Sequence, residues 1–127
     1  MNVAYVFSTP NASYILSKMI IPQLEEGRHG ATVVGMFFFV DNNYLLVRGN
    51  PTGERLARVA RKTGMLLMGC DQCCYQRSIA DRIIEGIPIG CFPDLYRALS
   101  GAKVDQVITL YPRSSRGTRY DSERAYR

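Results

Sequence analysis

Cysteine is the residue type in this chain whose spacing most clearly suggests chemistry, because three of the four cysteines lie within five residues. They follow a short apolar segment, residues 65–68, which is typical of a buried strand and which Gly69 is expected to end. Asp71 is a favourable N-cap for a helix that runs on through Ala80, so Cys70 is predicted at the helix N-terminus. The partial positive charge of a helix N-terminus favours a thiolate. The sequence therefore predicts a lowered pKa and a reactive sulfur at Cys70.

Cys70 shares one face of the predicted helix with three further residues, which follow it at helical spacing: Cys73, Cys74 and Arg77. The Arg77 guanidinium, about two turns along, is expected to add positive charge, and the main-chain N–H groups of residues 71–73 can bind an anion. Asp71 acts in the opposite direction, because a carboxylate beside a thiolate raises the pKa of the thiol. Cys73 or Cys74 can then serve as a resolving thiol in thiol–disulfide exchange.

Other uses of the same cysteines remain open. Cys70 and Cys73 have the spacing of a dithiol redox pair, although thioredoxin-like motifs usually follow the first strand of their fold. Four thiolates can bind zinc, but only one C-x-x-C pair is present among Cys70, Cys73, Cys74 and Cys91, so the metal signal is weak. The plainest alternative is a set of inert, buried small side chains in an oligomeric interaction module.

The composition is that of one globular domain. The chain has 127 residues, of which 46% are hydrophobic, enough for a single core. Its longest apolar run, residues 33–40, is much shorter than the roughly 18 residues of a membrane span, and its first residues lack the basic start of a secretory signal. Clustered cysteines without such a signal predict a reducing compartment, the cytoplasm. No Walker loop, dinucleotide-binding glycine motif or Ser/His/Asp order is present, and no cofactor is predicted.

The positive charge is uneven along the chain. The net charge is +5, and residues 112–127 carry five arginines against Asp121 and Glu123, so this segment alone contributes +3. We interpret residues 1–111 as an α/β domain and residues 112–127 as a basic, flexible tail whose charges are solvated. Interleaved arginines and tyrosines in the tail are too generic a pattern to predict nucleic-acid binding.

Predicted strands and helices alternate along the whole domain. The segments predicted as strands are 2–7, 31–40, 65–68, 87–91 and 104–110, and the helices between them are 11–26, 50–63, 71–80 and 93–100. This alternation favours a parallel sheet covered by helices on both faces. In such sheets ligands bind at the carboxyl ends of the strands, where both Cys70 and Cys91 are predicted.

Several single residues support or interrupt this pattern. Asn11 and Asn50 are suitable helix caps, and Gly64 is expected to end the helix that begins after Asn50. Pro22 lies inside the first helical segment and is predicted to kink or end it. His29, the only histidine, follows that helix and is interpreted as a surface or capping residue rather than a catalyst.

The order of these pieces resembles the DsrE/DsrF-like family, which includes the TusD-type sulfur-relay proteins. The resemblance covers residues 2–110. It includes an opening strand followed by a small polar turn, a helix ending in Gly-x-His, an apolar strand with three phenylalanines, and a strand ending in a cysteine with a basic residue seven positions on. The residues that carry it are Phe7, Ser8, Thr9, Pro10, Gly27, His29, Phe37, Phe38, Phe39, Cys70, Arg77, Leu99, Gly101, Asp105, Val107 and Ile108.

The resemblance implies a fold and a function. The implied fold is a three-layer α/β/α sandwich around a five-stranded, mainly parallel sheet. The implied activity is a sulfurtransferase-type relay, in which Cys70 accepts a sulfane sulfur from a donor as a persulfide and passes it to an acceptor. Thr9, Asp71 and Cys91 would lie around this site, and the implied assembly is a homo-trimer or hexamer. The extra Cys73 and Cys74 depart from the simplest members and leave selenium or metal handling open.

Overall fold

The computed structural model describes residues 1–111, and the basic tail predicted for residues 112–127 lies outside the described residues. Five strands form one sheet in the order β4-β3-β2-β1-β5. Every neighbouring pair is parallel, which confirms the parallel sheet expected from the sequence. The strands are β1 (Asn2–Phe7), β2 (Thr32–Phe38), β3 (Leu66–Cys70), β4 (Ile89–Gly90) and β5 (Gln106–Leu110).

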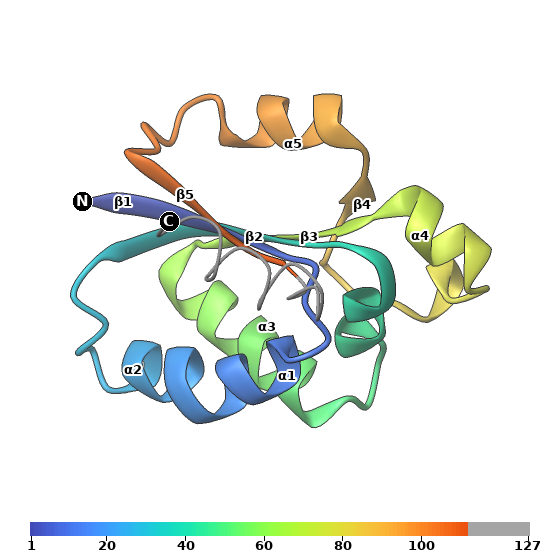
Figure 1. The fold of residues 1–127 in the computed structure, drawn as a ribbon, viewed down its shortest axis with the longest axis horizontal. Helices are drawn as coiled ribbons and strands as arrows, with labels where there is room; N and C mark the ends of the chain where they lie inside the picture. Colours follow the sequence, from blue (N-terminus) through green and yellow to red (C-terminus); the bar gives the residue numbers. More distant parts are fainter. Residues whose placement is uncertain (112–127) are drawn as a thin grey trace, which may run out of the picture.

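Helices cover both faces of this sheet, so the structure is the three-layer sandwich (Figure 1). One face carries α1 (Ala12–Ile15), α2 (Ile21–Glu25) and α3 (Pro51–Thr63), and the other carries α5 (Phe92–Leu99). The short helix α4 (Asp71–Gln76) follows β3 beyond the carboxyl end of the sheet. Parallel strands need such crossover helices, and each apolar helix face is buried against the sheet between them.

The two faces of the sheet form two separate cores. The larger core lies under α1, α2 and α3 and includes Phe7, Phe38 and Leu56, all of which are fully buried. The smaller core lies under α5 and contains Phe37, Met68, Cys70, Cys73 and Leu95. Side chains along a strand alternate between the two faces, so Phe37 and Phe38 belong to different cores. The predicted nucleophile Cys70 therefore packs in the smaller core.

The first helical segment is less regular than its sequence pattern predicts. A π-helical turn, Leu16–Ile20, joins α1 to α2, and Pro22 lies in the first turn of α2. Proline is tolerated there because first-turn N–H groups need no partner in their own helix, so the hydrogen-bonding pattern changes near Pro22 but the helix does not end. Asn11 makes no side-chain cap; its N–H instead donates to Thr9 Oγ1 at 3.2 Å.

The predicted cap and stop of the next helix are confirmed. The Asn50 side chain accepts hydrogen bonds from the N–H groups of Thr52 and Gly53 and caps α3, and Gly64 ends that helix with a φ of +79°. Strand β4 is shorter than expected; Pro88, which precedes it, has no N–H to extend the ladder. His29 lies before β2, and its Nε2 is 2.8 Å from the Tyr5 hydroxyl oxygen. It therefore lies near the amino ends of the parallel strands, whereas Cys70 lies at the carboxyl end of β3.

Candidate functional site

Two of the predicted site cysteines lie where neighbouring strands end. Cys70 is the last residue of β3, and Cys91 directly follows β4. The two strands pair in parallel, with Cys70 opposite Gly90. The prediction that both cysteines stand at carboxyl ends of strands is confirmed, and adjacent parallel strands bring these ends to the same edge of the sheet.

The helix after β3 differs from its prediction in its start and its length. Cys70, not Asp71, is the N-cap, and the Cys70 Sγ accepts the Cys73 N–H at 3.5 Å. Asp71 is the first helical residue, and its carboxylate accepts the Gln72 N–H at 2.7 Å. The helix ends at Gln76 instead of continuing through Ala80, because the backbone at Ser78 turns left-handed, with a φ of +55°.

The thiol of Cys70 does not have the lowered pKa that its position suggested. Its side chain packs in the smaller core, and the residue is only 6% exposed. Burial raises the pKa of the Cys70 thiol, and a hydrogen bond to the Cys73 thiol raises it further. The backbone N–H groups of Cys73 and Gln72 act in the opposite direction without reversing the shift. Desolvation of the charged form therefore outweighs the helix start here.

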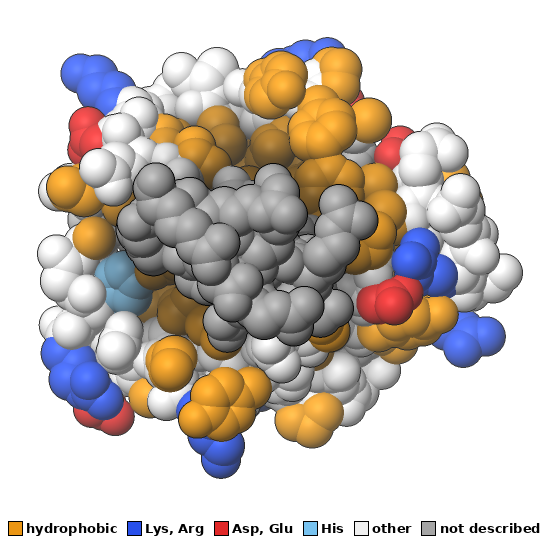
Figure 2. Space-filling model, in the orientation of Figure 1, with side chains coloured by type: hydrophobic (Ala, Val, Ile, Leu, Met, Phe, Trp, Pro, Cys, Tyr) orange, Lys and Arg blue, Asp and Glu red, His pale blue; other side chains and the backbone are white. Residues whose placement is uncertain are grey.

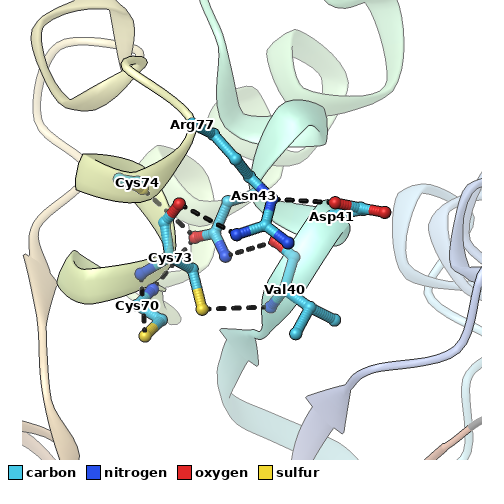
Figure 3. A network of polar contacts seen from close by, with 7 residues as sticks. All are labelled: Val40, Asp41, Asn43, Cys70, Cys73, Cys74 and Arg77. Atoms are coloured by element: carbon cyan, nitrogen blue, oxygen red, sulfur yellow. Dashed lines mark hydrogen bonds and ion pairs between the residues drawn. The ribbon is translucent and has the colours of Figure 1, made fainter.

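Cys73 makes a polar contact of its own. Its Sγ accepts the backbone N–H of Val40 at 3.2 Å (Figure 3). Val40 follows β2 and has a φ of +46°, a left-handed conformation that is uncommon for a β-branched residue. The chain therefore adopts a costly backbone geometry at the point where its N–H meets the Cys73 sulfur.

Asn43, which no sequence motif indicates as a site residue, connects the cysteine turn to the segment after β2. It belongs to the 3-10 helix Val40–Leu46 and is fully buried. Its Oδ1 accepts the Cys70 N–H at 2.9 Å and the Cys74 thiol at 3.4 Å, while its Nδ2 donates to the Val40 carbonyl oxygen at 2.9 Å (Figure 3). Nothing in the local pattern of residues 41–43 indicates a long-range contact.

Cys74 is sealed inside the structure. The residue has no exposed surface and packs in the larger core. Burial raises the pKa of its thiol to about 11, and the neighbouring Cys70 and Cys73 sulfurs contribute to the rise. Because it remains a protonated donor to Asn43 at neutral pH, Cys74 is better suited to holding the site together than to resolving a sulfur intermediate.

Arg77 contacts the site at a different point from the one expected. Its Nε donates to the Asp41 carboxylate at 2.8 Å, and its Nη1 donates to the Cys73 carbonyl oxygen at 3.1 Å. Its charge lowers the pKa of Cys74, where burial has the larger effect. The guanidinium thus joins the end of α4 to the segment after β2.

Cys91 and Thr9, both predicted near the site, are held by local contacts. Partly buried Cys91 is the N-cap of α5, where its N–H donates to Asp94 Oδ2 at 2.9 Å and its sulfur accepts the Asp94 N–H in a capping box. Thr9 is buried in the turn after β1, and its N–H donates to the Leu110 carbonyl oxygen at 3.1 Å. Among residues 1–111, no hydrogen bond joins Thr9 to a cysteine.

The four cysteines do not converge as a metal site. Within the part of the chain that the structure describes, no group of three or more His, Cys, Asp or Glu side chains has a geometry that could hold a metal ion. The thiol of Cys74 points to Asn43 and that of Cys73 to Val40, so the two sulfurs do not point toward a common metal position. The zinc alternative has no geometric support.

Comparisons with known proteins give the fold but no family. No protein-family model matches the sequence, and no curated protein matches it at a significant level. The solved structure of the YchN protein from E. coli is similar over 86% of this chain and 97% of its own, with 19% identity and a TM-score of 0.60. MTH1491 of Methanobacterium thermoautotrophicum, a protein of unknown function, covers 86% and 98% at 9% identity and a TM-score of 0.61. BT1422 of Bacteroides thetaiotaomicron, another such protein, covers 85% and 94% at 11% identity and a TM-score of 0.58.

The described helices are also too short or too polar for a bilayer. Across residues 1–111, no helix has the length and apolar character needed to cross a membrane.

Proposed function

We propose that this protein is a sulfur-relay protein, which accepts a sulfane sulfur as a persulfide on Cys70 and passes it to a partner. The observation that carries the proposal is the position of Cys70 where β3 passes into α4: Cys70 caps the helix, and its Sγ accepts the Cys73 N–H at 3.5 Å. The resemblance of the sequence to the DsrE/DsrF-like sulfur-relay proteins supports the same activity, and the shared fold of the solved neighbours is compatible with it.

The buried Cys70 thiol needs help to become a nucleophile, because its pKa is raised. The backbone N–H of Cys73 supplies part of it, because this N–H donates to Cys70 Sγ at 3.5 Å and favours the Cys70 thiolate as Cys70 attacks. Cys70 Sγ bonds to the outer sulfur of a donor R–S–SH, the donor S–S bond breaks, and R–S⁻ leaves with a proton. No electron donor or acceptor is required. The 6% exposure of Cys70 restricts direct donors to slender ones, such as inorganic polysulfide or a small persulfide.

Sulfur loading on defined cysteines tests this proposal. The reduced protein is treated with inorganic polysulfide, and its intact mass is measured before and after a thiol reductant. We expect a reductant-labile gain of one or more sulfur atoms in the wild type and no gain in Cys70→Ser. Cys91→Ser is the matched control, because Cys91 is also an N-cap at a strand end, and it should lower the gain without abolishing it. A wild-type mass that does not change would exclude the relay.

A dithiol redox switch is the second candidate, and the hydrogen bond from the Cys73 N–H to Cys70 Sγ, which holds the two cysteines together at the start of α4, favours it specifically. Treatment with a mild disulfide oxidant would then lower the mass by two hydrogens without adding sulfur. A disulfide between the two residues, located by peptide mapping and abolished in either serine variant, would support the switch. A chain that stays reduced under the oxidant but gains sulfur from polysulfide would exclude it.

We also infer that the protein works in the cytoplasm as a homo-trimer or hexamer, with donor and acceptor proteins as transient partners. The four free thiols suit a reducing compartment. Exposed aromatic side chains support an assembly: Phe92 and Tyr96 stack on α5 with ring centroids 6.3 Å apart, and apolar side chains gather near this helix (Figure 2). Tyr96→Asp should reduce the mass measured by sedimentation. Tyr14→Asp, at an equally exposed tyrosine on α1, should leave it unchanged.

A further inference from the structure

Cys73 contacts two other groups of the site. Its backbone N–H donates to Cys70 Sγ at 3.5 Å, and its own Sγ accepts the Val40 N–H at 3.2 Å (Figure 3). Cys70 and Cys73 both pack in the smaller core, with 6% and 9% of their surface exposed, whereas Val40 is 43% exposed. Cys73 is therefore the cysteine that joins Cys70 to Val40 at the rim of the site.

Two further contacts fix this arrangement. The Val40 carbonyl oxygen accepts the Asn43 amide at 2.9 Å, and Asn43 also binds the Cys70 N–H. One buried side chain thus sets the positions of the Val40 N–H and of the cysteine turn together. The left-handed φ of +46° at Val40 persists within this network, which is the setting in which a strained residue suggests a function.

We propose that a sulfur atom bound to Cys70 moves to Cys73 before it leaves the chain, so that Cys73 carries the persulfide that the acceptor thiol attacks. This inference rests on the proposed sulfur-relay function and adds a second carrier to it. The Val40 N–H is the group that holds the persulfide anion on Cys73. The acceptor class is a thiolate, from either a protein cysteine or a small thiol.

The transfer step balances without an oxidant or a reductant. The Cys73 thiolate attacks the outer sulfur of Cys70–S–SH, a new S–S bond forms at Cys73 Sγ, and the original S–S bond breaks with its electron pair remaining on Cys70 Sγ. The proton of the outer sulfur moves to Cys70. The products are Cys73–S–S⁻ and the Cys70 thiol, with the same total charge as before the step.

The surroundings of the two sulfurs give this step a direction. Burial raises the pKa of Cys70, so Cys70 retains a proton more readily than an exposed thiol. The persulfide anion forms on Cys73, where the Val40 N–H already donates to sulfur. An added sulfur atom extends about 2 Å from Sγ, and on Cys73 it starts beside a residue with an exposed side chain. We therefore expect the acceptor thiolate to approach from the Val40 side, because Cys73 itself is only 9% exposed and Cys70 6%.

The position of the persulfide over time tests the proposal in the wild-type chain. The protein is loaded with inorganic polysulfide, excess polysulfide is removed, glutathione is added as the acceptor, and samples are alkylated at intervals. Cleavage after Lys62 and Arg77 releases residues 63–77, in which tandem mass spectrometry locates the alkylated persulfide. We expect the label first on Cys70, then on Cys73, with the Cys73 label decaying as glutathione persulfide forms.

A variant adds an independent rate measurement. Cys73→Ser should still load on Cys70 but should release sulfur to glutathione at least about tenfold more slowly, equivalent to ~1.4 kcal/mol in the barrier. A label that never reaches Cys73, with release from Cys73→Ser at the wild-type rate, would overturn the inference while the relay function stands. Release of hydrogen sulfide with a Cys70–Cys73 disulfide would overturn it in favour of the redox switch. A wild-type chain that takes up no sulfur would overturn both proposals.

Discussion

The turn at Cys70 and the turn at Cys91 are built on the same plan and differ in the side chain that completes them. In each, a glycine precedes a cysteine at the carboxyl end of a strand, and the cysteine caps a helix. In each, a Cβ on the glycine would collide with a polar side chain. At Gly69 that side chain is Asn43, whose Oδ1 would be 2.5 Å away, and at Gly90 it is Asp94, whose Oδ2 would be 2.8 Å away.

The difference separates a helix cap from a site for sulfur chemistry. Asp94 lies three residues after Cys91, so its capping box is local and complete. Asn43 is neutral, comes from another element, and binds two cysteine residues at once. A neutral, long-range clamp fixes several sulfurs without opposing negative charge on them, which explains why we assign the chemistry to Cys70 and Cys73.

The largest expected effect is at the two glycines. Gly69→Ala should destabilise the protein by about 4 kcal/mol, because the added methyl displaces buried Asn43 and breaks its hydrogen bonds as well as overpacking the turn. Gly90→Ala should cost about 2 kcal/mol, because partly exposed Asp94 can move its carboxylate away but its Cβ, also 2.8 Å from the added methyl, moves only with the backbone of α5. Urea denaturation measures both. Equal losses would mean that the two turns depend on their polar side chains to the same degree.

Removing the polar side chains themselves should give the next largest effect. Asn43→Ala should lower the free energy of unfolding by about 3 kcal/mol, because it leaves the buried Cys70 N–H unsatisfied and opens a cavity. Asp94→Ala removes one part of an exposed capping box and should cost about 1 kcal/mol. Denaturant unfolding with matched slopes provides the comparison. A loss below 1 kcal/mol for Asn43→Ala would contradict its role as the clamp of the cysteine turn.

The pH dependence of stability should show the effect of burying the Cys74 thiol. The folded pKa of Cys74 is about 11, above that of a thiol in the unfolded chain, so its contribution is complete below the unfolded pKa and is lost as the pH rises toward 11. Between pH 8 and 11 the loss should be on the order of 2 kcal/mol.

A variant isolates this contribution from the other groups that titrate in the same range. Cys74→Ala should show less loss of stability between pH 8 and 11 than the wild type, because the buried thiol that ionises in this range is removed. The free energy of unfolding is measured in urea at both pH values. If Cys74→Ala and the wild type lose the same stability, the thiol of Cys74 ionises without a burial penalty and the prediction is wrong.

The sequence was sufficient for the elements but not for the contacts between them. The alternation of apolar runs and helical segments predicted the parallel sheet, and the apolar segments 65–68 and 87–91 placed both cysteines at strand ends. These features depend on neighbours along the chain. The Asn50 cap and the Gly64 stop were predictable for the same reason.

The polar groups of the site were missed because they depend on contacts over long sequence separations. Asn43 and Val40 lie 27 and 33 residues from the cysteines that they bind, and a polar stretch such as residues 41–43 has the same pattern whether it forms a turn or a clamp. Burial depth is equally invisible in the sequence. Helix position alone predicted a lowered pKa for Cys70, whereas the packing of α5 over the smaller core raises it.

The smallest predicted effect tests whether the Cys70 side of this comparison contains backbone strain. Val40→Gly should stabilise the protein by about 1 kcal/mol or less, because glycine adopts a positive φ without steric cost while keeping the N–H that binds Cys73. Lys103→Gly is the matched control, at a φ of +49° in the loop before β5, away from both turns. Its gain should be smaller, because lysine lacks the branched Cβ that makes this conformation costly for valine. Thermal denaturation of the two variants measures the difference in stability. A larger increase in stability for Lys103→Gly than for Val40→Gly would show that the backbone at Val40 is not strained by its contact with the cysteine site.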